Sequence, residues 1–217
     1  MKKVITIDGP SASGKGTLAI LLAEKLGWDI LDSGALYRAF AFFSLKELDE
    51  NIIAENLKNI TFKIIDKKIE VLFKNNDISN YLRNEKTAIQ ASKISSLQKT
   101  REILLPIQRA FLDNNNLVAD GRDMGSVVFP DAALKFFLDA TPEIRAKRRY
   151  LELQKRGQEV NIHHLIKDIT ERDEKDKMRK LSPLTKTDDT ILLDSTNLTQ
   201  NSMLNEALKS IIESKII

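Results

Sequence analysis

The chain has 217 residues and no cysteine. This absence excludes a disulfide scaffold and a thiolate metal site, and it is typical of a reducing compartment, so we expect a cytoplasmic protein. No apolar run approaches the roughly 20 residues that a membrane helix needs. The start, Met1-Lys2-Lys3 before one short apolar run, is too short for a signal peptide. We therefore expect no membrane partner.

An excess of one charge is also missing. The 34 basic and 31 acidic residues leave a net charge of only +3. General affinity for nucleic acid requires basic side chains gathered on one surface, so nucleic acid is not an expected partner. With 42% apolar residues, a chain of this length can bury one core and a small appended subdomain. We expect it to be a monomer.

Short apolar segments alternate with helical patterns along the chain. The expected strands are Val4–Ile7, Ile30-Leu31, Leu117–Asp120, Leu134–Leu138 and Ile191–Leu193. Each is short and flanked by polar or turn residues, as parallel strands covered on both faces are. Two of the expected helices run from Pro142 to about Arg156 and from Leu165 to about Arg179. The alternation predicts an α/β fold with a five-stranded parallel sheet flanked by helices.

The stretch from about residue 51 to residue 116 breaks this alternation. Thr61–Ile65 and Ile69–Phe73 predict a hairpin around a charged turn, and Asp77-Ile78-Ser79 predicts a third strand. Spaced apolar residues after it predict two helices. A hairpin with helices between two core strands predicts an inserted subdomain, and it leaves a core of about residues 1–50 and 117–217.

A glycine-bounded loop follows the first expected strand. Its nine residues are Gly9, Pro10, Ser11, Ala12, Ser13, Gly14, Lys15, Gly16 and Thr17. The two outer glycines permit a tight turn and a close approach of the backbone to an anion, and N–H groups at a helix start attract negative charge. Lys15 can reach the β- and γ-phosphates of a nucleotide. The spacing matches the P-loop pattern G-x-x-x-x-G-K and predicts an ATP site; the alternative is a plain turn.

The residue after the lysine distinguishes this loop from most P-loops. Gly16 stands where a hydroxyl that contacts the metal usually follows, and Thr17 comes one place later. The G-K-G-T variant points away from typical GTPases and motor ATPases. It favours the small-molecule kinases that resemble adenylate kinase.

Polar segments follow two further expected strands, and ligands of an open α/β sheet bind beyond the carboxyl ends of its strands. After the second strand, Ser33 can cap a helix and Arg38 can hold a phosphate, although a capped helix with a solvated arginine is an equal alternative. After the third strand, Arg122 suits bidentate phosphate binding, and Asp123 suits an exocyclic amine such as cytosine N4. The alternative there is a salt-bridged loop.

Basic residues gather on the last two expected helices, namely Arg145, Arg148, Arg149, Arg156, Arg172, Lys175 and Arg179. Charge runs are usually solvated faces, yet phosphoryl transfer needs several cations around the developing charge. The joining segment, roughly 157–161, predicts a short basic flap over ATP. The adjacent His163 and His164 have no ligand partners in the sequence and predict exposed helix residues, so no metal site made by the protein alone is expected.

Four motifs together resemble those of bacterial cytidylate kinases. They are G-P-S-A-S-G-K-G-T, D-S-G-A-L-Y-R, A-D-G-R-D-M-G-S-V-V-F-P-D-A and E-R-D-E-K-D-K-M-R, and they occur in the family's order from Val4 to about Asp194. The D-G-R-D-M-G segment is the most specific. The motifs D-I-S-N-Y-L-R, A-S-K-I-S and T-R-E-I-L-L-P-I-Q-R-A-F also resemble the family's nucleoside-monophosphate-binding insert. The resemblance implies a P-loop kinase core, a small α+β insert at about 51–116 and a short lid at about 150–165.

The resemblance also implies an activity, which is transfer of the γ-phosphate of ATP to CMP or dCMP with Mg²⁺ by direct in-line transfer, in pyrimidine nucleotide metabolism. It implies that Lys15, Arg122 and Arg172 serve the reacting phosphates. The acceptor would be held by Ser33, Arg38 and Arg122 at its phosphate pocket, by Ser92, Arg101 and Asp123 at cytosine, and by Asp176 and Arg179 at the sugar. Position 175 is lysine where the family often has arginine, so no role is carried over to Lys175.

Two other functions are compatible with a P-loop. The first is a kinase for UMP or dTMP, although the carboxylate of Asp123 favours a base that bears an amino group. The second is a P-loop switch or nucleic-acid-binding ATPase, against which the near-neutral charge and the acceptor motifs count. CMP and dCMP both stay open as acceptors.

Overall fold

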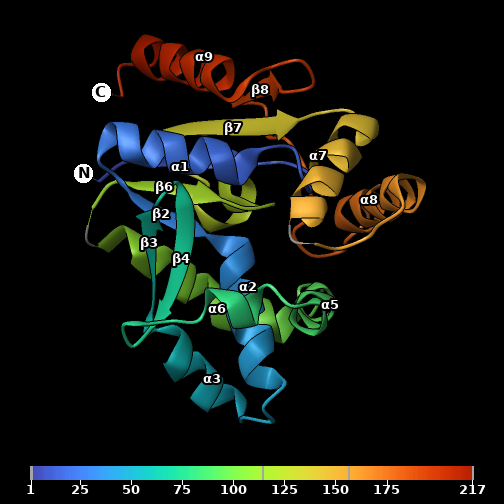
Figure 1. Ribbon diagram of the computed structural model, residues 1–217. Coiled ribbons are helices and arrows are strands. Elements are labelled where there is room, and N and C mark those ends of the chain that lie inside the picture. Colours follow the sequence, from blue (N-terminus) through green and yellow to red (C-terminus); the bar gives the residue numbers. More distant parts are fainter. Residues whose placement is uncertain (1, 114, 156, 217) are drawn as a thin grey trace. The chain divides into compact units, whose positions relative to one another are not determined.

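The computed structural model describes residues 2–113, 115–155 and 157–216. Its strands form a five-stranded parallel sheet in the order β2-β6-β1-β7-β8 and a three-stranded sheet in the order β3-β4-β5 (Figure 1). By residue contacts the chain divides into two compact units. Unit 1 comprises Met1–Val4 and Ala19–Asp120, and unit 2 comprises Ile5–Leu18 and Gly121–Ile217.

The parallel sheet confirms all five strands expected from the apolar runs. Its strands are β1 (Val4–Asp8), β2 (Asp29–Asp32), β6 (Leu117–Asp120), β7 (Leu134–Asp139) and β8 (Thr190–Asp194). The pairs β2–β6, β1–β7 and β7–β8 run parallel. Each strand ends at an aspartate, a residue type that strands disfavour and that readily accepts N–H groups of a following turn. The apolar runs therefore end where polar loops begin.

The hairpin of unit 1 also follows the sequence. Strands β3 (Ile60–Ile65) and β4 (Lys68–Phe73) are antiparallel and pair from Ile60↔Phe73 to Ile65↔Lys68. The turn has only two residues, Asp66 and Lys67, and both have positive φ (49° and 57°), as the tight turns that match strand twist require.

The expected third strand is shorter than the sequence suggested. β5 covers only Asn76–Asp77, and Ser79 begins α4 (Ser79–Leu82). The reason is local: the amide of Val71 donates to the Ser79 hydroxyl at 2.9 Å, and the Ser79 amide donates to the Asp77 carboxylate at 2.8 Å. Side chains thus replace the backbone ladder at this point.

The remaining helices of unit 1 include those that carry Ser33, Arg38, Ser92 and Arg101. They are α2 (Ser33–Ser44), α3 (Glu50–Leu57), α5 (Glu85–Ile94) and α6 (Gln98–Ala110), with a 3₁₀ turn η1 (Phe111–Asp113) after α6. The prediction that Ser33 caps a helix is wrong. The cap is Asp32, whose carboxylate accepts from the Ala35 amide at 2.8 Å, and Ser33 is the first helical residue. Both residue types can cap, and the one at the strand end does so.

Helix α1 (Lys15–Leu26) starts in the glycine-bounded loop and ends before Gly27, whose φ of 64° is typical of a residue that ends a helix. The other long helices are α7 (Pro142–Lys155), α8 (Ile162–Lys177) and α9 (Gln200–Glu213). Arg156, the expected end of α7, lies outside the described residues. Helix α8 begins three residues earlier than expected because the side chain of Asn161 caps it, accepting from the His163 amide at 2.8 Å.

A π-helical turn, η2 (Met124–Val128), follows the D-G-R-D segment, and no sequence pattern indicated it. Such turns are rare and are frequent at functional sites. Among the described residues, no helix combines the length and the apolar character that crossing a membrane requires.

Candidate functional site

The glycine-bounded loop of unit 2 has the strained backbone that its sequence predicts. Gly9 has a φ of 145° and Gly14 a φ of 102°. A Cβ atom at Gly9 would lie 2.0 Å from the carbonyl oxygen of Leu138, so no larger residue fits there. Between them Ala12 also has a left-handed φ, 59°. Left-handed residues within such a loop turn successive N–H groups to one side, which is the geometry of an anion-binding concavity.

The carbonyl groups of this loop are held by side chains. Lys15 Nζ donates to the Pro10 carbonyl at 2.8 Å, and the ammonium-bearing side chain is only 6% exposed. The Ser13 carbonyl accepts from an Arg148 nitrogen at 3.0 Å and from the Ser195 hydroxyl at 2.7 Å. Because the carbonyl oxygens bind donors of the protein, the loop presents a fixed backbone to a ligand.

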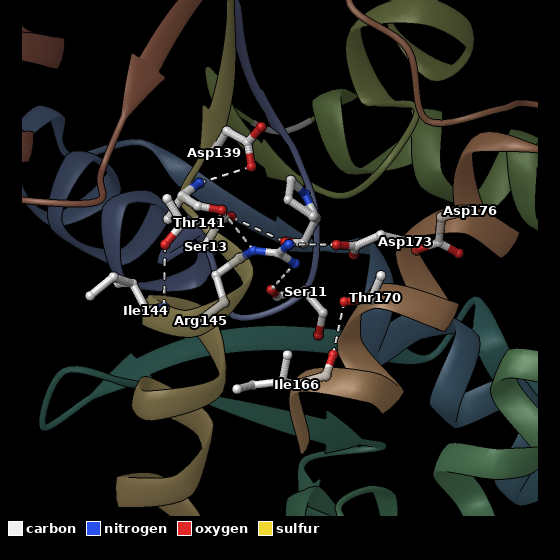
Figure 2. Close-up of polar contacts among 12 residues, drawn as sticks. Ser11, Ser13, Asp139, Thr141, Ile144, Arg145, Ile166, Thr170, Asp173 and Asp176 are labelled. Atoms are coloured by element: carbon white, nitrogen blue, oxygen red, sulfur yellow. Dashed lines mark hydrogen bonds and ion pairs between the residues drawn. The ribbon is translucent and has the colours of Figure 1, made fainter. Parts of the chain in front are cut away.

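Arg145 ties the same loop to helix α8. Its Nη1 donates to the Ser11 carbonyl at 3.2 Å, its Nε donates to the Ala140 carbonyl at 2.9 Å, and its Nη2 lies 2.5 Å from Asp173 Oδ2. Figure 2 shows the guanidinium of Arg145 between Ser11 and Asp173. Arg145 and Arg148 are three residues apart on α7 and therefore share a face of that helix.

Asp8, at the end of β1, holds the segment that carries Arg122 and Asp123. Its two carboxylate oxygens accept from the amides of Met124 and Gly125, at 2.9 and 2.8 Å. Burial raises the pKa of Asp8 from 3.8 to about 6, and the nearby negative charge of Asp123 acts in the same direction. The two amide hydrogen bonds and the charge of Lys15 oppose this rise in pKa.

A carboxylate between two guanidinium groups forms the centre of the second cluster in unit 2. Asp176, on α8, is 2% exposed and pairs with Arg122 at 3.2 Å through its Oδ2 and with Arg179 through its Oδ1. Arg122 also donates to the Gly121 carbonyl at 3.1 Å. Two guanidinium groups on one carboxylate give these three side chains a net charge of +1, and guanidinium groups suit a phosphorylated ligand.

The residues of unit 1 that were predicted to hold an acceptor lie on three helices. Ser33 of α2 accepts from Gln108 Nε2 of α6 at 2.9 Å, and both side chains are buried. Arg38 lies 3.5 Å from the Leu82 carbonyl. Arg101 donates to the Ser95 carbonyl at 2.8 Å, and its guanidinium lies 5.8 Å from the centre of the Tyr37 ring.

The structure brings some of the predicted site residues together within a unit. The predicted loop residues 9–17 are already contiguous in the sequence. Arg122, which is distant in the sequence from Asp176 and Arg179, forms one cluster with them. Ser92 is exposed on α5, and Arg172 is exposed on α8. Of the predicted basic residues, Arg156 lies outside the described part of the chain. His163 and His164 are exposed, and in the described residues no group of three metal-ligating side chains forms a cluster.

Several polar residues at the site were missed by the sequence reasoning, namely Asp8, Tyr37, Gln108, Asp173 and Ser195. Asp8 carried a signal, since it ends the strand before the glycine-bounded loop. Asp173 also carried one, since it lies three residues before Asp176 and so faces the same side of α8. Gln108 lies in the quoted motif T-R-E-I-L-L-P-I-Q-R-A-F, but nothing local indicated its partner Ser33, which lies 75 residues away. Ser195 carried no signal, because its partner lies 182 residues away.

Comparison with known proteins gives consistent similarities. A family model described as "Cytidylate kinase" matches residues 5–213. The chain is 46% identical to a protein named cytidylate kinase from Aeromonas salmonicida (strain A449), over 96% of this chain and 93% of that one. It is 45% identical to a cytidylate kinase of Vibrio cholerae serotype O1, covering 99% and 97%. Among solved structures, TT1252 from Thermus thermophilus has a TM-score of 0.52 at 18% identity, covering 98% and 97%, which shows a shared fold.

Proposed function

The chain belongs to the cytidylate kinase family and is a nucleotide kinase, and we propose that it transfers the γ-phosphate of ATP to CMP or dCMP, giving CDP or dCDP and ADP. The observation that carries this proposal is the family match over residues 5–213. Kinases for UMP or dTMP and non-metabolic ATPases are not favoured by it. The reaction would belong to pyrimidine nucleotide metabolism in the cytoplasm, catalysed by a monomer without nucleic-acid or membrane partners.

The donor ATP is proposed to bind the loop from Gly9 to Thr17. Its backbone N–H groups would surround the phosphates, and Lys15 would exchange its hydrogen bond to the Pro10 carbonyl for the transferring phosphate. Asp8 is occupied by two amide donors, and Gly16 offers no hydroxyl. We therefore propose that Mg²⁺ arrives as part of the substrate MgATP, held mainly by phosphate oxygens and water.

The acceptor CMP is proposed to bind the residues that the family resemblance implies. Its phosphate would bind Arg38 and Arg122, with Ser33 in the same pocket, and its cytosine would be read by Ser92, Arg101 and Asp123. Asp176 and Arg179 would contact the sugar, and Arg172 would stabilise the phosphates together with Lys15. The pairing of Asp176 with both Arg122 and Arg179 supports a common ligand for these three side chains.

The chemistry needs no covalent enzyme intermediate. An oxygen of the CMP phosphate, already ionised at neutral pH, attacks the γ-phosphorus of ATP. The new P–O bond forms as the bond to the β,γ-bridging oxygen breaks, and ADP leaves with that electron pair. The charge on the oxygens of the transferring phosphoryl group is stabilised by Lys15, Arg122 and Arg172. Catalysis therefore depends on positioning and electrostatics.

We propose that three regions of the chain have different roles. A core of about residues 1–50 and 117–217 would hold ATP, an insert of about 51–116 would hold the acceptor, and a short lid of about 150–165 would cover ATP. The short link from the end of α7 at Lys155 to the start of α8 at Ile162 supports a lid without a domain of its own.

A panel of monophosphates tests this function. The purified chain with MgATP should form CDP from CMP over many turnovers, without DNA or a protein partner, and CMP should give a higher kcat/KM than UMP or dTMP. Lys15→Ala should retain the fold and lower kcat by a factor that corresponds to about 3 kcal/mol or more, because a contact to the transferring group is lost. Near wild-type kcat in that variant would show that the loop does not act on phosphate.

A further inference from the structure

The ion pair between Arg145 and Asp173 joins two parts of unit 2 that have different proposed ligands. Arg145 donates to the Ser11 carbonyl at 3.2 Å, in the loop from Gly9 to Thr17 that we call the phosphate loop. The Nη2 of Arg145 also lies 2.5 Å from Oδ2 of Asp173, which belongs to α8 (Figure 2). A third bond from Arg145, to the Ala140 carbonyl at 2.9 Å, occupies Nε. Since a guanidinium group is planar and rigid, these three partners together fix its orientation.

Burial makes this pair different from the exposed ion pair of α8. The Arg145 and Asp173 side chains are 4% and 10% exposed. By contrast, Lys167 and Glu171 are 75% and 51% exposed and lie 3.8 Å apart. Charges excluded from water interact strongly, and an exposed pair contributes little. Movement at one end of the buried pair is therefore strongly coupled to the other end.

The carboxylate of Asp173 depends on Arg145 for its position. Its second oxygen, Oδ1, is buried and has no hydrogen-bond partner among the described residues. Asp176 lies three residues further along α8, on the same face, and it pairs with Arg122 and Arg179. A shift of Asp173 therefore also shifts Asp176 and the cluster around it, which is proposed to hold the acceptor.

We propose that Arg145 and Asp173 are positioning residues that transmit occupancy of the phosphate loop to helix α8. An anion on the N–H side of the loop polarises its peptide groups and makes the Ser11 carbonyl a stronger acceptor. Arg145 is then held more firmly and, through Asp173, orders α8 and the Asp176 cluster before the acceptor binds. The inference rests on the proposed function, in which ATP phosphates bind this loop.

Hydrogen exchange of the full-length protein, with and without a non-hydrolysable ATP analogue and Mg²⁺, tests the proposal. In the wild type, the analogue should slow exchange both at loop amides 11–15 and along α8. In Asp173→Asn, which retains the size of the side chain and removes its charge, slowing at the loop should persist and slowing along α8 should be lost. Glu171→Gln removes an exposed charge from the same helix and should respond as the wild type does. Comparing each variant with and without ligand cancels any general loss of stability.

Kinetics and a conservative variant give a second measurement. Asp173→Asn should lower kcat with the KM for ATP nearly unchanged, whereas Asp173→Glu, which keeps the charge, should recover part of the α8 response. If Asp173→Asn does not fold, the same hydrogen-exchange measurement is made on Asp173→Glu and Arg145→Lys. A partial slowing of exchange along α8 is expected in both.

The outcomes separate this inference from the proposed function. Slowing at the loop but not along α8 in the wild type would overturn the inference alone. An α8 response in Asp173→Asn equal to that of the wild type would do the same. If the analogue slows exchange at neither place in the wild type, the ATP site itself is wrong, and the inference is overturned with it.

Discussion

Asp123 is a carboxylate with only 5% of its surface exposed, immediately after an arginine proposed to bind phosphate. A carboxylate only accepts hydrogen bonds, so it suits the N4 amino group of cytosine and repels the O4 carbonyl of uracil. We predict that Asp123→Asn lowers kcat/KM for CMP and narrows the preference for CMP over UMP by roughly tenfold or more, equivalent to ~1.4 kcal/mol. Steady-state rates with both substrates measure this.

Asp131→Asn is the matched control for that change, because Asp131 is exposed and follows the same segment of chain. It should leave both rates near those of the wild type. Equal losses for CMP and UMP in Asp123→Asn would mean that Asp123 serves the phosphate or the loop, and that cytosine is read by other residues.

Asp8 gives the free energy of unfolding a predictable pH dependence. Its pKa in the fold is about 6 and its ordinary value is 3.8, so the folded state binds the proton more tightly. The contribution of this group is therefore fully present below pH 3.8 and is lost as the pH rises to 6. We predict that the difference in unfolding free energy between the wild type and Asp8→Asn falls across this window by on the order of 3 kcal/mol. Urea unfolding of both proteins from pH 4 to 7 measures it, and a flat or rising difference would contradict the assigned pKa.

At the scale of elements, Gly9 in the loop and Gly27 at the end of α1 separate two properties of glycine. Gly9 and Gly27 both have positive φ, at 145° and 64°. A Cβ at Gly9 would meet the backbone of β7, whereas one at Gly27 meets nothing within 4 Å. We predict that Gly27→Ala costs about 1–2 kcal/mol of stability through its backbone alone and leaves turnover unchanged.

Gly9→Ala should cost more than Gly27→Ala and should abolish turnover, because the loop or β7 must move to admit the methyl group. Urea unfolding and CDP formation, measured on both variants, separate the two effects. Equal destabilisation with retained turnover would mean that the loop does not need this close approach to β7.

The elements that the sequence predicted are those whose signals are local. The apolar run Leu134–Leu138 predicts β7 almost to its end, and the glycine spacing predicts the loop. Ends of elements were less predictable where two neighbours compete for one role, as Asp32 and Ser33 do at the start of α2. The site was predicted as separate motifs. Its internal contacts, such as Arg122 with Asp176, 54 residues apart, depend on tertiary packing that no local pattern records.

At the scale of the whole molecule, each compact unit is assembled from two stretches of chain. Unit 2 takes residues 5–18 from near the start and residues 121–217 from the second half, and unit 1 ends at Asp120. β1 is complete at Asp8, but its parallel neighbour β7 begins at Leu134. Contacts between residues so distant in sequence form slowly.

This separation has a consequence for biosynthesis. A ribosome adds about 5–20 residues per second. An interval on the order of ten seconds therefore separates synthesis of the phosphate loop from synthesis of β7. The side chains that bind its carbonyls, Arg145, Arg148 and Ser195, follow later still. A nascent chain halted before β7 lacks both the strand that pairs with β1 in the register Ile5↔Leu134 to Asp8↔Phe137 and the side chains that hold the loop. The first functional motif to be translated is thus among the last to reach its working shape.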